Sequence, residues 1–294
     1  MTTPLLTRAE AMSIIQQARD QGEVPNLQGV NLTKADLSGA DLRLANLSGA
    51  ILQEANLSKT DLTGANLCNA NLRDTNLSWT SLRQADLSGA KLDRANLRHA
   101  AINESTRLHD KWRLIWEIVT TEKNKRKLPQ ADLSRADLRF VSLVGADLYQ
   151  ARLTESDLHK ADLTDANLSH TDLQHVNLSE ANLSRANLIR ADLRQAGLGQ
   201  ANLDRADFQG ANLEGSYLGM AILSNANFSE ANLSWTNLSG ADLGRINLEG
   251  AILTGANLRW TYLYGANLRR AIYDHTTQWP TNFVPSIAGA VNTD

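Results

Sequence analysis

Six histidines, one cysteine and many aspartates are the residues of this chain whose chemistry could serve catalysis or metal binding. A zinc site needs ligands at characteristic spacings, and His170 and His175, five positions apart, match none of them. An enzyme also needs unlike groups that converge in one pocket. The sequence contains neither a glycine-rich phosphate-binding loop nor a nucleophile elbow. We therefore expect no catalytic residue, no metal and no cofactor, and we expect that the chain is not an enzyme.

The aspartates belong to a five-residue repeat that covers most of the chain. Residues 35–39 read Ala-Asp-Leu-Ser-Gly and residues 181–185 read Ala-Asn-Leu-Ser-Arg. If the leucine is called position i, position i−2 is small, position i−1 is Asp or Asn, and positions i+1 and i+2 are mostly polar or glycine. Because the repeat itself places these carboxylates, their number is no evidence of catalysis.

A period of five is neither the 3.6-residue period of a helix nor the two-residue period of a long strand. In a short extended segment, the side chains at i and i−2 point to the same side, so leucine and alanine face inward together. The polar and glycine-rich positions that follow are typical of a turn. Each pentad is therefore predicted to form one side of a coil, and the repeats together a β-solenoid.

The motif A(D/N)LXX, as it stands at residues 35–39 and 181–185, resembles the repeat of the pentapeptide-repeat proteins. The resemblance implies an all-β solenoid, a right-handed quadrilateral β-helix with four pentads in each coil. Phe208 and Phe228, the phenylalanines at position i, lie twenty residues apart, so a coil of this length would stack them. The string DKWRLIWEIV, from Asp110, also resembles a segment of cyanobacterial members of the family.

Two segments outside the repeats have helical features. Thr7 and Glu10 form a capping-box pair near the N-terminus, and Gly22 is placed to end that helix. A second helix is predicted near residues 110–121, with Asp110 as its N-cap. The chain then divides into a helical cap (1–24), a first repeat block (25–104), a helical insert with a basic loop (105–130), a second repeat block (131–275) and a tail (276–294).

Charge and composition argue against some classes of partner and indicate a cellular location. The chain has 32 acidic and 29 basic residues, a net charge of -3, so no strong field points to nucleic acid or to a membrane. The first residues lack the features of a signal peptide, and no apolar run is long enough to span a bilayer. The one cysteine, Cys68, excludes an intramolecular disulfide and fits a reducing compartment. We expect a cytoplasmic protein.

The second repeat block carries large apolar residues at outward positions of its last coils. Exposed apolar patches often mark contacts with other molecules. Three alternatives are open: the tail folds back over these side chains, a partner protein binds them, or a second copy of the chain self-associates through the C-terminal coils. The candidate partner-binding patch, called the aromatic patch below, consists of Tyr217, Met220, Ile222, Trp260, Tyr262 and Tyr264.

The leading functional hypothesis is a non-catalytic structural or protein-interaction rod whose partner is unknown. The alternative comes from the family, in which some members resemble duplex DNA and bind DNA gyrase. That mechanism needs a strongly acidic rod, and arginines such as Arg185 and Arg205 interrupt the second block. Arg185, Arg205 and Arg245 fall at equivalent positions and form either a groove for an anionic partner or ordinary solvated charge.

Overall fold

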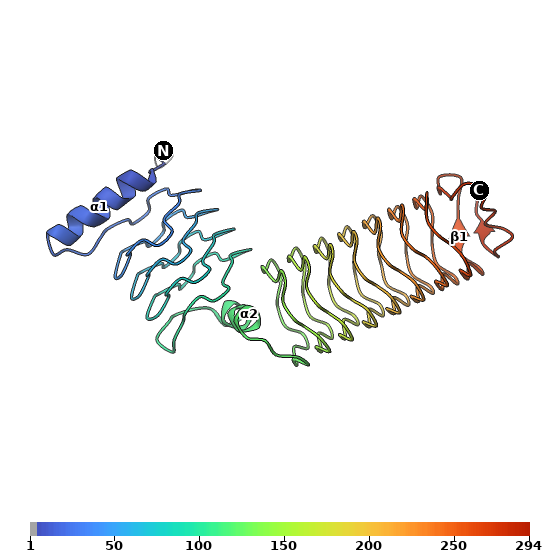
Figure 1. Ribbon diagram of the computed structural model, residues 1–294, viewed down its shortest axis with the longest axis horizontal. Helices are drawn as coiled ribbons and strands as arrows, with labels where there is room; N and C mark the ends of the chain where they lie inside the picture. Colours follow the sequence, from blue (N-terminus) through green and yellow to red (C-terminus); the bar gives the residue numbers. More distant parts are fainter. Residues whose placement is uncertain (1–4) are drawn as a thin grey trace. The chain divides into compact units, whose positions relative to one another are not determined.

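The computed structural model describes residues 5–294, which fold as two compact units that divide between Thr121 and Glu122. In both units the chain winds as a right-handed quadrilateral β-helix, and Figure 1 shows the successive coils stacked within each unit. The regular pairing runs to Arg107 in the first unit and begins at Lys127 in the second. The two helices are α1 (Arg8–Asp20) and α2 (Asp110–Thr120), and the two longest strands are β1 (Ile272–Tyr273) and β2 (Val291–Asn292).

Each coil contains four pentads, as the resemblance implied. Residues twenty positions apart pair in parallel, for example Asn46 with Asn66 and Asp162 with Asn182. In each pairing the N–H of the leucine donates to the coil that follows, as Leu27 does to the carbonyl of Asn46 at 2.8 Å. The N–H of Asn46 donates in turn to the carbonyl of Pro25 in the preceding coil, at 2.9 Å. Interior coils therefore satisfy their backbone groups in both directions.

The Asp or Asn at position i−1 stabilises the turn at the corner of each coil. Its side chain accepts a hydrogen bond from the backbone N–H two residues later, as Asp36 does from Ser38 at 3.0 Å. This Asx turn bends the chain at the corner of the coil. The residue at i+2 then adopts a left-handed conformation, with φ of +67° at Gly39 and +59° at Arg185. The carboxylates of the repeat are therefore used by the turns.

The core of each unit is a set of stacked apolar columns. The leucines at position i and the alanines at i−2 are buried, as at Leu183 and Ala181. The predicted stack of Phe208 on Phe228 is confirmed, with ring centroids 4.3 Å apart and an interplanar angle of 12°. Small and large residues alternate along each side, and this alternation fills the narrow interior.

Helix α1 covers the starting edge of the first unit (Figure 1). The predicted capping box is present, since Thr7 accepts from the N–H of Glu10 and the Glu10 carboxylate accepts from the N–H of Thr7. Beyond its last turn Gly22 has φ of +71°, in the left-handed region that glycine tolerates. Two arginines of the helix donate to carbonyls of the first coil: Arg8 to Ser38 at 3.3 Å and Arg19 to Arg43 at 2.7 Å. These carbonyls have no preceding coil to pair with, so the helix satisfies them.

Helix α2 packs on the last coil of the first unit, where Trp112, Ile115 and Ile118 are buried. The indole N–H of Trp116 donates to the carbonyl of Ala100 at 2.7 Å. The prediction that Asp110 is the N-cap was wrong. His109 caps the helix, because its backbone is extended and its Nδ1 accepts from the N–H of Lys111, while Asp110 lies inside the first turn.

The tail of the second unit returns to the last coil as strand β2, which pairs in parallel with β1. Between these strands the ring of Trp279 stacks on Phe283, with centroids 5.3 Å apart, and meets Tyr273 edge-on. Among residues 5–294, neither helix is long and apolar enough to cross a membrane.

Candidate interaction surface

The aromatic patch is exposed in the second unit. Trp260 has 80% of its surface exposed, Tyr264 70%, Met220 65% and Tyr262 63%. The pentad geometry explains this, because these residues occupy positions i−1, i+1 and i+2, whose side chains point away from the core. The hypothesis that the tail folds back over these side chains was wrong. The tail instead follows the ends of the core columns and joins β1 through β2.

The patch spans three successive coils and has an interruption in the middle one. Ile222 pairs with Asp242, and Asp242 pairs with Tyr262, so an acidic residue separates the two apolar side chains. In the neighbouring column Gly240 takes the position between Met220 and Trp260. A Cβ at this glycine would lie 3.7 Å from Cγ of Met220. The apolar surface is therefore concentrated at Trp260, Tyr262 and Tyr264, in the last coil.

A shallow pocket of about 240 Å³ lies beside the two tyrosines. Their ring centroids are 6.3 Å apart. The carboxylate of Asp242 is held on both oxygens, by the Ser224 hydroxyl at 2.7 Å and by the N–H of Gly244 at 2.9 Å. These two hydrogen bonds fix the orientation of the Asp242 carboxylate in the wall of the pocket. The lining residues are Ser224, Asn225, Asp242, Gly244, Arg245, Tyr262 and Tyr264.

Tyr217 differs from the rest of the patch because its ring lies against backbone. A Cβ at Gly219 would lie 2.5 Å from the Tyr217 hydroxyl oxygen, and one at Gly199 would lie 2.7 Å from its Cε1. The two glycines leave the space that this ring occupies. Tyr217 is 47% exposed, less than the aromatic residues of the last coil.

The histidines are dispersed along the chain, and several of them have structural contacts. His99 stacks on Trp79 with centroids 4.1 Å apart, His159 lies 3.0 Å from the Ser179 hydroxyl, and His109 caps α2. Over residues 5–294, no three His, Cys, Asp or Glu side chains come together in a way that would hold a metal ion.

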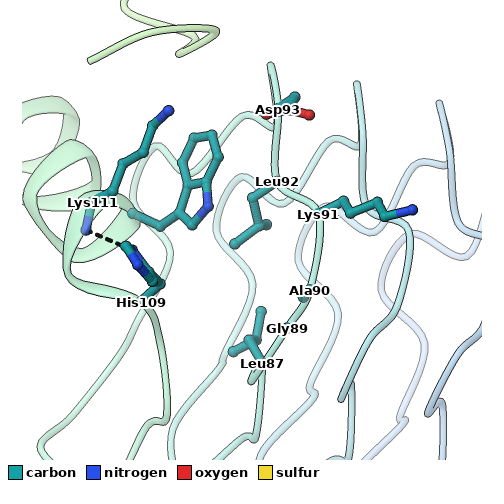
Figure 2. A pocket seen from close by; sticks show the side chains of 9 residues that line it. Leu87, Gly89, Ala90, Lys91, Leu92, Asp93, His109 and Lys111 are labelled. Carbon is teal, nitrogen blue, oxygen red and sulfur yellow. Dashed lines mark hydrogen bonds between the residues drawn. The ribbon is translucent and has the colours of Figure 1, made fainter. Parts of the chain in front are cut away.

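A second pocket, of about 330 Å³, lies in the first unit between the start of α2 and residues 87–93 (Figure 2). Figure 2 shows the His109 ring hydrogen-bonded to the backbone N–H of Lys111. The Asp93 carboxylate accepts from Nε of Arg73 at 2.9 Å. The histidine and the carboxylate of this pocket are thus both engaged in structural bonds.

Arg185, Arg205 and Arg245 form one column of the second unit, and the first two of them lie beside carboxylates. Nε and a terminal nitrogen of Arg185 donate to the two oxygens of Asp165, at 2.7 Å and 2.8 Å. This contact holds the pKa of the Asp165 carboxyl below its usual range. Arg205 lies 3.6 Å from Asp204. Of the two interpretations of this column, ordinary surface charge agrees better with these contacts than a groove for an anion.

These observations define a β-helical repeat protein whose most distinctive surface is an exposed cluster of aromatic side chains. The family model described as pentapeptide repeats matches the chain in eight copies. Its matches span more than half of the chain, so the chain belongs to the pentapeptide-repeat family. The matched segments are residues 26–64, 60–98, 131–169, 161–200, 206–245 and 231–270.

Solved structures of the family also resemble the chain, whereas no curated protein matches it. HetL, a pentapeptide repeat protein involved in heterocyst differentiation regulation from the cyanobacterium Nostoc sp. strain PCC 7120, is 30% identical over 91% of this chain and 97% of its own, with a TM-score of 0.33. The pentapeptide repeat protein alr5209 from Nostoc PCC 7120 is 34% identical over 45% of this chain and 84% of its own, with a TM-score of 0.16. QnrB1, a plasmid-mediated fluoroquinolone resistance protein, is 12% identical over 90% of this chain and 94% of its own, with a TM-score of 0.26. At these TM-scores the likeness extends no further than the family.

Proposed function

We propose that this chain is a non-catalytic, protein-binding member of the pentapeptide-repeat family, and that the aromatic patch is its binding surface. The observation that carries the proposal is the exposure of Trp260, Tyr262 and Tyr264 within five residues of one coil. Tryptophan and tyrosine are enriched at the centres of protein interfaces, where they bury a large area at a small cost in conformational entropy. A repeat scaffold with paired backbone on its inner coils holds such side chains in fixed positions.

The shape of the surface supports a protein partner rather than a small molecule. The pocket beside the tyrosines, at about 240 Å³, is smaller than the cavities of about 300–1,000 Å³ that enclose most small ligands. Exposed aromatic side chains that project from the surface instead suit the depressions of another protein. We also propose a cytoplasmic location, supported by the single free cysteine.

Affinity capture with matched variants tests this proposal. The intact chain and the variant W260A/Y262A/Y264A are used to capture proteins from the cells that produce the protein, and the captured proteins are quantified by mass spectrometry. The control is Trp235→Ala, since Trp235 is also exposed in the second unit but lies outside the patch. We expect at least one protein to be lost with the triple variant and retained with the control. Identical capture by all three chains would contradict the proposal.

The DNA-mimic alternative has less support. A protein that imitates DNA needs uncompensated acidic charge along its surface. In this chain, carboxylates such as Asp165 and Glu249 are paired with arginine, and the net charge is only -3. A gyrase supercoiling assay discriminates the two functions. We expect no change in supercoiling at a micromolar excess of the protein.

A further inference from the structure

The four sides of the last coil in the second unit differ in their backbone hydrogen bonding. On three sides the last coil finds further backbone partners: β1 pairs with β2, the N–H of Leu258 donates to Gln278 at 2.7 Å, and the N–H of Arg270 donates to Gly289 at 2.9 Å. The side formed by residues 261–265, called the Leu263 edge below, differs. Within the described chain, the N–H groups of Leu263 and Gly265 have no hydrogen-bond acceptor.

The preceding coil shows the hydrogen bonds that these N–H groups would make if another coil followed. There the N–H of Leu243 donates to the carbonyl of Tyr262 at 3.0 Å, and that of Arg245 donates to the carbonyl of Tyr264 at 2.9 Å. Leu263 and Gly265 occupy the equivalent positions one coil later. The Leu263 edge therefore presents a row of backbone donors set up for one more parallel strand.

The packing of the side chains at this edge is also incomplete. Leu243 and the other leucines below it in this column are fully buried, whereas Leu263 is only partly buried. Tyr262 and Tyr264, on either side of it, are exposed. An apolar column thus ends at a surface that is accessible to another chain.

We infer that the Leu263 edge binds an extended segment of the partner protein, which adds to the β-helix as a parallel strand. This inference rests on the proposed function and specifies how the partner would be recognised. The stacking rule of the coils gives the chemistry of the segment: a small residue over Thr261, then any residue, then a large aliphatic residue over Leu263. The outward residues flanking the aliphatic one would lie over Tyr262 and Tyr264, so an aromatic or arginine side chain suits them best.

The tail of this chain is a poor occupant of the edge. It is already held by the pairing of Val291 with Ile272. Between Gln278 and this strand lie Pro280 and Pro285, which lack an N–H, and Asn282, whose φ of +65° is not extended. A second copy related by a twofold axis would present the same edge in the antiparallel direction. All pairings of the coils in the described chain are parallel.

Hydrogen exchange with a synthetic peptide tests the inference on the intact chain. The probe is the capped peptide Lys-Ala-Tyr-Leu-Tyr-Gly-Lys, in which alanine and leucine follow the required spacing. In the free protein we expect fast exchange at the amides of Leu263 and Gly265 and slow exchange at those of Leu243 and Arg245. With saturating peptide, the first two amides should slow at least tenfold while the other two stay unchanged.

Two modified peptides serve as controls. Methylation of the first tyrosine nitrogen removes the donor to the carbonyl of Thr261 and should weaken binding about tenfold. Replacement of the leucine by aspartate removes the apolar contact with Leu263 and should weaken binding by about tenfold to a hundredfold. Equal binding of all three peptides would show that backbone pairing at this edge is not involved, and would overturn the inference.

The remaining outcomes separate this inference from the proposed function. If the peptide leaves Leu263 and Gly265 unprotected while capture still depends on the three aromatic residues, the edge inference fails and the patch stands. If the peptide protects both amides while capture ignores those residues, the edge stands and the patch fails. Protection of both amides without peptide, in a chain that sediments as a dimer, would assign the edge to a second copy and overturn the inference.

Discussion

Phe208 and Phe228 stack face to face on successive coils of the second unit, with centroids 4.3 Å apart. Both rings are fully buried, in a column whose other members are leucines. The two phenylalanines therefore replace leucines within an otherwise regular core. The contribution of their contact to stability can be measured by changing them back to leucine.

We expect Phe228→Ala to lower the free energy of unfolding of the intact protein by about 3–5 kcal/mol, because the cavity it leaves cannot collapse between two fixed coils. Phe228→Leu restores the common residue of the column and should cost much less. The aromatic contact itself should contribute about 0.5–1.5 kcal/mol, measured by a double-mutant cycle with Phe208→Leu in denaturant unfolding. A coupling energy near zero would contradict this assignment.

Trp116 is expected to stabilise the end of the first unit through its hydrogen bond to the carbonyl of Ala100. The change Trp116→Phe keeps most of the apolar contact and removes the donor, so we expect a loss of about 1 kcal/mol. Trp79→Phe is the matched control, since Trp79 is mostly exposed and its ring contact is with His99. Thermal unfolding of the two variants compares them directly, and equal shifts would contradict the assigned role.

Cys68 is expected to react slowly with alkylating reagents. Burial raises the pKa of its thiol, and the hydrogen bond to Asp86 with the negative charge of that carboxylate raises the pKa further. Since the thiolate is the nucleophile, the reactive fraction at neutral pH is small. Asp86→Asn removes the charge and should increase the alkylation rate. An unchanged rate in this variant would leave burial as the main cause.

Acid should loosen the contact between α1 and the first coil. Hydrogen bonds from Arg43 are the main reason why the pKa of Asp41 is lowered to about 2. A carboxyl whose folded pKa lies below its unfolded value of about 3.9 stabilises the fold above that value, and the contribution is lost as the pH falls towards 2. Arg19 of α1 also lies 3.5 Å from this carboxylate. A carboxyl titration followed by NMR should show this low pKa, and Arg43→Gln should raise it towards the ordinary range.

Local features of the fold were predictable where they depend on neighbours in the chain. The capping box of Thr7 and Glu10, the helix near residues 110–121 and the stack of Phe208 on Phe228 all follow from residue types at fixed spacings. The N-cap of α2 was less predictable, because His109 and Asp110 can both accept a backbone N–H, and the backbone conformation decides between them. The use of Asp and Asn side chains in the corner turns had a signal in the sequence, namely their fixed place before each leucine.

The sequence by itself determined the five-residue period, and with it the inward and outward direction of each side chain, because turns and extended segments are set by neighbouring residues. Only the tertiary structure decided which outward groups stay exposed at the end of the β-helix. The path of the tail from Gln278 to Val291 crosses the chain's own last coil. It supplies a strand beside Ile272 but no partner for Leu263 or Gly265. That path depends on contacts between residues far apart in the chain, and no local spacing specifies it.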